Sequence, residues 1–65
     1  MRIFFINLEK MEEECSGWIN NGSTYELRSM FDEYISVDKT TGEIEQYGYG
    51  GLVSDWFRAG LLKVV

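Results

Sequence analysis

The feature that most constrains the fold is an apolar run that leads directly into an acidic, amphipathic stretch. Residues 2–8 (RIFFINL) are apolar on both faces of an extended chain, which is typical of a central β-strand. Asn7 favours a helix N-cap, and the apolar residues around and after it recur at helical spacing. These residues are Leu8, Met11, Cys15, Trp18 and Ile19. The pattern predicts a strand and then a core-facing helix with an acidic back.

The end of this helix and the start of a second one are predicted by residues 20–26. Residues 20–22 (NNG) form a helix stop, although Gly17, about 1 kcal/mol worse than alanine inside a helix, could break the helix before Trp18. Ser23 and Glu26 match the S-x-x-E capping box, in which each residue satisfies a backbone N–H of the other. Apolar residues then follow at helical spacing: Leu27, Met30, Phe31 and Tyr34. We therefore predict a helix over residues 24–34.

A β-hairpin is predicted next. Residues 35–37 and 44–47 are short alternating runs, and the loop of residues 38–43 between them fits a type I turn closed by a glycine in the left-handed region. The exit of the hairpin, residues 48–51 (GYGG), has no Cβ at three of four positions. It could act as a hinge or as a loop that lets other groups approach closely.

The C-terminal part is predicted to form a short helix over residues 52–59, ending at Gly60, and a closing strand over residues 61–65. At 65 residues the chain is one domain, in which only about 60% of the unfolded surface can be buried. Aromatic residues make up 15% of the chain and compensate for this small core. We expect a single α+β domain over residues 1–65, with about four antiparallel strands and two to three short helices on one face.

The charge distribution narrows the classes of partner. The net charge is −5, and residues 1–45 carry ten acids against four bases, so they hold all the negative excess. Such a field repels nucleic acid and anionic membranes and steers the protein toward a basic surface. We therefore expect neither direct nucleic-acid binding nor membrane binding.

The sequence lacks the residues of a catalytic or metal site. Histidine is absent, and Cys15 is the only cysteine, so disulfides and CxxC metal motifs are excluded. Glutamates beside Cys15 would raise its pKa, which favours a buried core residue over a nucleophile. Four acids that could gather around a divalent cation lack EF-hand spacing: Asp32, Asp38, Glu43 and Glu45. We expect a non-enzymatic protein without metal or cofactor.

The apolar segments and the single cysteine bear on the location of the protein. The N-terminal apolar run is too short for a signal peptide, and no run approaches 18 apolar residues. A single cysteine suits a reducing compartment. These features predict a cytoplasmic protein.

Two groups of residues are candidates for partner binding. The first group consists of acids. Pairs such as Glu9 and Glu13 place like charges at i, i+4, which costs a helix about 0.2–0.5 kcal/mol of stability. This cost suggests that the acids form a functional surface, and the alternative is an ordinary solvated helix face. The second consists of tyrosines in and beside the Gly-rich loop, which could either contact a partner or complete the core. The candidates are Glu9, Glu12, Glu13, Asp32, Glu43, Glu45, Tyr47 and Tyr49.

The N-terminal quarter resembles the opening of the ArdA-type antirestriction proteins, which have a short apolar strand, an N-L-x-K step, acidic positions and a Gly/Trp pair. The matching residues are Asn7, Leu8, Lys10, Glu13, Gly17 and Trp18. The resemblance implies an acidic, small, non-enzymatic protein that inhibits restriction enzymes by imitating the charge of DNA. The chain also looks like short acidic phage proteins that act as anti-CRISPR inhibitors.

Two functional hypotheses follow. The first is an inhibitor encoded by a phage or mobile element, monomeric or homodimeric, whose acidic surface binds a basic cleft of a host nuclease or restriction enzyme. The second is a structural or regulatory module that self-associates through an aromatic surface. That surface would contain Tyr47, Tyr49, Trp56 and Phe57.

Overall fold

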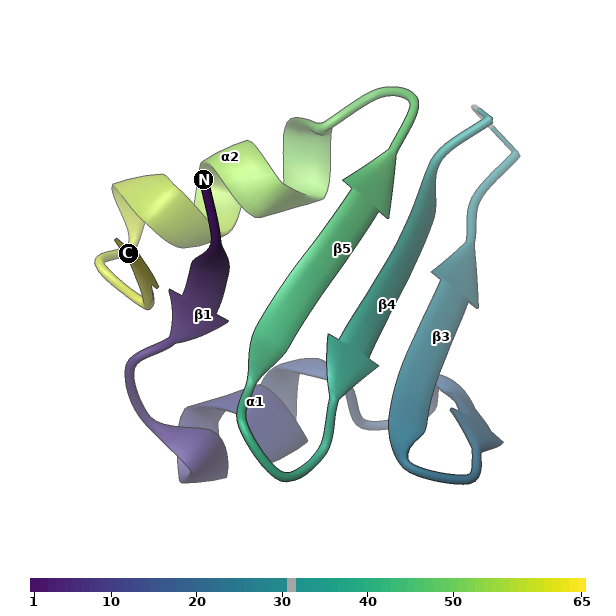
Figure 1. Ribbon diagram of the computed structural model, residues 1–65. Helices are drawn as coiled ribbons and strands as arrows, with labels where there is room; N and C mark the ends of the chain where they lie inside the picture. Colours follow the sequence, from purple (N-terminus) through teal and green to yellow (C-terminus); the bar gives the residue numbers. More distant parts are fainter. Residues whose placement is uncertain (31) are drawn as a thin grey trace.

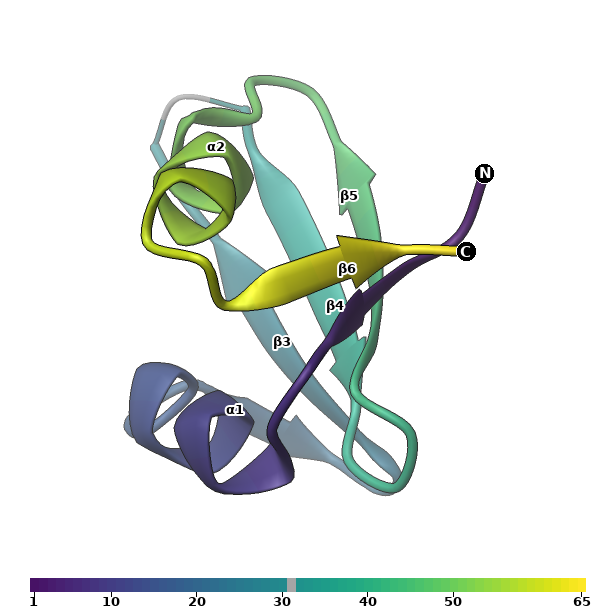
Figure 2. The same ribbon diagram turned by 90° about the vertical axis from the view of Figure 1, so that its left-hand side faces the viewer.

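The computed structural model describes residues 1–30 and 32–65, which form one antiparallel sheet with both helices on the same face (Figures 1 and 2). The strands pair in the order β2-β3-β4-β5-β1-β6. The predicted α+β class with an antiparallel sheet is confirmed, but the sheet has six strands instead of about four. The elements in chain order are β1 (Ile3–Phe5), α1 (Leu8–Glu14), β2 (Ile19–Asn21), β3 (Thr24–Arg28), β4 (Tyr34–Asp38), β5 (Glu43–Tyr47), α2 (Gly51–Arg58) and β6 (Leu62–Val64).

The predicted strand and helix at the N-terminus are both present and both shorter than predicted. The Asn7 side chain caps α1 by accepting hydrogen bonds from the backbone N–H groups of Glu9 and Lys10, at 2.8 and 3.3 Å. The helix stops at Glu14, and Gly17 then adopts a φ of +86°, so the chain turns before Trp18 as the glycine suggested. Ile19, predicted to face the core from the helix, lies instead in β2 and is 62% exposed.

The helix predicted over residues 24–34 is wrong. Gly22, with a φ of +61°, and Ser23 form a two-residue turn that joins β2 to β3, and residues 24–28 (TYELR) alternate between the two faces of the sheet. A glycine at the first position of a two-residue loop matches the right-handed twist of the flanking strands, so hairpin pairing replaces the capping box. Met30, predicted to lie in the core, is 89% exposed. The part of this prediction that falls on Phe31 lies outside the described residues.

The predicted hairpin at residues 35–47 is confirmed as β4 and β5. The Asp38 carboxylate closes the loop by accepting hydrogen bonds from the Thr40 and Thr41 backbone N–H groups, at 2.8 and 3.0 Å. Gly42 adopts a φ of +78°, as predicted for the last residue of this turn. The hairpin is therefore defined by local sequence alone.

The core lies between the sheet and the two helices. The helix predicted over residues 52–59 is α2, and it buries Val53 and Trp56 against the sheet. The Trp56 ring packs on Phe5 and Trp18, with ring centroids 4.8 and 5.8 Å away. The buried apolar residues are Phe5, Met11, Cys15, Ile35, Val37, Ile44, Val53, Trp56 and Leu62.

The two ends of the chain lie side by side at one margin of the sheet (Figure 2). Arg2 and Val65 exchange two backbone hydrogen bonds, at 3.2 and 2.8 Å. These bonds extend the pairing of β1 with β6 by one position beyond the strands themselves. Neither helix of the described chain is long and apolar enough to cross a membrane.

Candidate functional site

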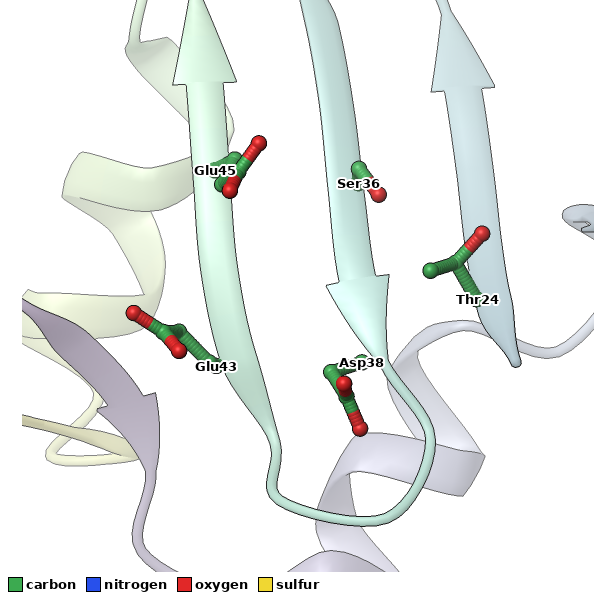
Figure 3. Close-up of a pocket in the computed structure, with 5 residues that line it drawn as sticks. All are labelled: Thr24, Ser36, Asp38, Glu43 and Glu45. Atoms are coloured by element: carbon green, nitrogen blue, oxygen red, sulfur yellow. The ribbon is translucent and has the colours of Figure 1, made fainter.

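The face of the sheet that the helices leave uncovered carries a group of carboxylates. Ile35 and Val37 of β4 point into the core, so by alternation Ser36 points to the opposite face, where it is paired with Glu45 of β5. We call this face the open face. A hollow of about 170 Å³ lies on this face. Its lining side chains come from β3, β4 and β5, as Figure 3 shows. The lining residues are Thr24, Ser36, Asp38, Glu43 and Glu45.

Glu26 of β3 lies on the same face and is held by three donors. Its carboxylate accepts hydrogen bonds from the Asn21 side-chain amide, from the Tyr34 hydroxyl at 2.8 Å and from the Thr24 hydroxyl at 3.2 Å. The hydrogen bonds from Asn21 and Tyr34 lower the pKa of Glu26, because they stabilise the ionised form. Glu26 is therefore a fixed anion.

Asp38 and Glu43 are ionised for the same kind of reason. The Thr40 hydroxyl donates to Asp38 at 2.6 Å, and this bond together with the backbone bonds of the loop lowers the pKa of Asp38. The Arg2 guanidinium donates two hydrogen bonds to Glu43, at 3.0 and 2.9 Å, and lowers the pKa of Glu43. Both carboxylates are thus held in one orientation.

The direction of these three pKa shifts fixes their effect on stability. The ordinary values are 3.8 for Asp38 and 4.5 for Glu26 and Glu43, and the folded protein lowers each of them. The folded state therefore binds fewer protons than the unfolded state, so the three groups stabilise it above those ordinary values. That stabilisation is lost as the pH falls through the lowered values. At neutral pH all three carry full negative charge.

Glu45 differs from these three residues. Its side chain is exposed, projects from the open face beside Ser36 (Figure 3), and makes no hydrogen bond or ion pair to any residue in the described ranges 1–30 and 32–65. Two arginines lie beside the acids of the open face: Arg2 pairs with Glu43, and Arg28 stands at the end of β3. We call the four acids Glu26, Asp38, Glu43 and Glu45 the acidic sheet patch.

The structure does not bring the α1 glutamates to this patch. Helix α1, which carries these acids, lies on the covered face of the sheet (Figure 2). Glu12 accepts a hydrogen bond from the Tyr25 hydroxyl, Glu13 pairs with Lys10 at 3.3 Å, and Glu9 makes no side-chain contact of this kind within the described chain. The predicted acidic surface is therefore two surfaces on opposite sides of the sheet.

Glu14 of the same helix has a structural role. Its carboxylate accepts a hydrogen bond at 2.9 Å from the indole N–H of Trp56, which is 2% exposed. A buried indole N–H requires an acceptor, and Glu14 supplies it across the core. This link joins α1 to α2.

Asp32, another candidate, lies in the loop between β3 and β4 and lines a different hollow with Arg28 and Tyr34. Its φ of +56° is unusual for a residue with a Cβ. The acid that this loop buries is Glu33, which is 7% exposed and whose Oε2 atom has no hydrogen-bond partner in the described part of the chain. The loop therefore places Asp32 away from the acidic sheet patch.

The aromatic candidates also separate. Tyr47 is exposed on the open face, where its ring packs 6.0 Å from that of Tyr34, and Tyr49 is exposed in the loop after β5. Phe57 is on α2, on the other side of the sheet. Trp56 is in the core, so its predicted place in an exposed aromatic surface is wrong.

The reactivity of Cys15 is suppressed, as its acidic neighbours suggested. Burial of the thiol, followed by the charges of Glu12 and Glu14, raises the pKa of Cys15 to about 12. Cys15 is fully buried and packs in the core. It is therefore a core residue, as predicted.

The carboxylates of the site bear on which charged groups it suits. Across the residues that the structure describes, no three Cys, Asp or Glu side chains converge in a way that could hold a metal ion. The carboxylates of the acidic sheet patch can instead accept hydrogen bonds from guanidinium or ammonium groups.

Sequence reasoning missed Thr24, Glu26 and Ser36 as site residues. The signal that could have located them is the alternation of residues 24–28, since β3 places Thr24 and Glu26 beside Ser36 on one face.

Comparison with known proteins gave no match: no family model fits the sequence, and no curated protein or solved structure is significantly similar to it.

Proposed function

We propose that the protein is a non-enzymatic inhibitor, of the kind encoded by phages and mobile elements, that binds a basic cleft of a host nucleic-acid-handling defence protein. The observation that carries this proposal is the acidic sheet patch, in which three carboxylates are oriented and kept ionised by hydrogen bonds or an ion pair. Preoriented anions lose little conformational freedom when they bind, which favours affinity.

The geometry of the patch suits a surface that otherwise binds DNA. Two residues along a strand advance about 6.8 Å, as between Glu43 and Glu45. Carboxylates spaced along a strand can take the place of a row of phosphates against Lys and Arg side chains.

The α1 glutamates have a different part in this proposal. They lie away from the patch, so we assign them to long-range attraction, which raises the rate of encounter without contributing to the docked contact. The two acidic surfaces therefore predict different kinetic effects when their charge is removed.

The test compares two matched double variants on the partner captured from a host lysate. Glu43→Gln with Glu45→Gln and Glu9→Gln with Glu13→Gln each remove two negative charges, changing the net charge from −5 to −3. We expect the first variant to weaken binding at least about tenfold through faster dissociation, and the second to slow association by less than about threefold. Surface plasmon resonance measures both rates.

Two outcomes contradict the proposal. One is equal weakening by both variants, which would mean that net charge and not the acidic sheet patch determines binding. The other is a complex that forms equally well with wild-type protein and the patch variant and persists at about 0.5 M salt, where exposed charges are screened.

A further inference from the structure

The sheet is split where β1 leaves β5. These strands pair at only two positions, Ile3 opposite Ile44 and Phe4 opposite Glu43, whereas β5 pairs with β4 as far as Tyr47. Before Ile3 the chain continues to pair with the C-terminus on its other side, but no backbone hydrogen bond joins it to β5 within the described residues. A groove of about 430 Å³ lies at this split, between residues 1–3 and residues 43–47.

The β5 side of the groove presents unpaired backbone groups. Phe5 N–H donates to the Gly42 carbonyl at 2.9 Å, so the even-numbered residues around β5 direct their backbone groups toward β1. Gln46 is the even-numbered residue beyond the last pair. Its N–H and C=O therefore face the groove, where no backbone group of a described residue bonds to them, while its side chain donates to the Gly48 carbonyl at 2.7 Å. This is an open strand edge inside the sheet.

The groove wall already binds one guanidinium group. The Arg2 side chain donates two hydrogen bonds to Glu43, at 3.0 and 2.9 Å. Glu45 follows two residues along, on the same face and beside the groove, with an exposed carboxylate that no described side chain pairs with. Glu45 thus repeats the position of Glu43 without an arginine.

A second arginine position is suggested by Tyr47. On this face the Arg28 guanidinium lies 5.3 Å from the centroid of the Tyr34 ring, and Tyr34 packs on Tyr47. The exposed Tyr47 ring lines the groove and offers the same type of surface to a cation. The apolar parts of the lining, Ile3 and Ile44, suit side chains that point inward.

We propose that the groove binds an extended, arginine-bearing segment of the partner by strand addition to β5. The segment runs antiparallel to β5 and exchanges backbone hydrogen bonds with Gln46. One arginine forms a paired hydrogen bond with Glu45, and the arginine two residues away lies over Tyr47. This inference rests on the proposed function, because the arginine-bearing segment is taken to belong to the partner that binds the acidic sheet patch.

The probe is a blocked tripeptide of arginine, valine and arginine, whose valine lies opposite Gln46 and which stops short of Ile44, the partner of Ile3. Titration into the isotope-labelled full chain is followed by NMR. We expect shift changes centred on the amides of residues 45–47 and slower hydrogen exchange at the Gln46 amide. Glu45→Gln should weaken binding about tenfold, whereas the matched control Glu9→Gln should leave it unchanged.

A second peptide tests the backbone contact. N-methylation of its central valine removes the N–H that the Gln46 carbonyl accepts, and we expect binding to be lost. Equal binding of the two peptides, or shift changes centred on α1, would overturn the inference. Without peptide, hydrogen exchange at the Gln46 amide that slows as the protein concentration rises would overturn it as well. The groove would then be occupied by a second copy of this chain. In each case the comparison of double variants on the captured partner still tests the proposed function separately.

Discussion

Trp56→Ala is expected to leave most of the chain unfolded at room temperature. The Trp56 ring joins β1 through Phe5, the loop after α1 through Trp18, and α1 itself through the hydrogen bond to Glu14. Truncating a buried tryptophan costs about 3–5 kcal/mol. At roughly 0.05–0.15 kcal/mol per residue, the stability of 65 residues is about 3–10 kcal/mol, so this loss is comparable with the whole.

The matched control is Phe57→Ala, one position along the same helix. Phe57 is 39% exposed, against 2% for Trp56, so the control should cost no more than about 1 kcal/mol. Urea unfolding followed by far-ultraviolet circular dichroism measures both variants without relying on tryptophan fluorescence. Similar midpoints for the two variants would show that Trp56 does not hold the core together.

Gly48→Ala is expected to have the second largest effect. Gly48 adopts a φ of +82°, where a residue with a Cβ costs about 1–2 kcal/mol. An added Cβ would also overlap the Asp32 carbonyl oxygen and lie 3.1 Å from its carbonyl carbon. Both are backbone atoms that cannot move aside cheaply, so overpacking adds roughly 1–3 kcal/mol.

Gly17→Ala separates these two contributions. Gly17 has nearly the same φ, +86°, but an added Cβ there meets no atom within 4 Å. We expect this control to lose only the conformational cost of about 1–2 kcal/mol, measured in the same urea titration. Equal losses in the two variants would mean that the loop between β3 and β4 does not pack on Gly48 as described.

The elements that the sequence predicts well are those with strong local signals. Asn7 caps α1, Asp38 and Gly42 close the hairpin, and α2 begins and ends within one residue of its predicted range. In each case the hydrogen bonds that define the element are made by residues a few positions apart. The sequence pattern alone therefore contains them.

The failed prediction at residues 24–34 has a different cause. The S-x-x-E pattern at Ser23 and helical spacing after it favoured a helix, while Gly22 and the alternation of residues 24–28 favoured a hairpin. Pairing with β4, which involves all five residues of β3, stabilises the strand over the helix. This is a contact with a later segment, and no local pattern reports it.

The candidate site was predicted in part for the same reason. Glu43 and Glu45 were predicted from the excess of acids in residues 1–45, and the predicted hairpin, which is present, places them on or beside one strand. Glu26 joins them only through the order of strands β3, β4 and β5, which the misassigned helix concealed. The strand order also separates the α1 glutamates from the patch, a division that the sum of charges along residues 1–45 could not reveal.

The central claim is that the acidic sheet patch occupies the surface that the partner uses for nucleic acid, and competition with duplex DNA tests it most directly. The captured partner is held at constant concentration, and the binding of this protein is measured as duplex DNA is added. We predict mutually exclusive binding, so the apparent Kd for the protein rises in proportion to DNA concentration. A ternary complex, with an apparent Kd that DNA does not change, would contradict the account.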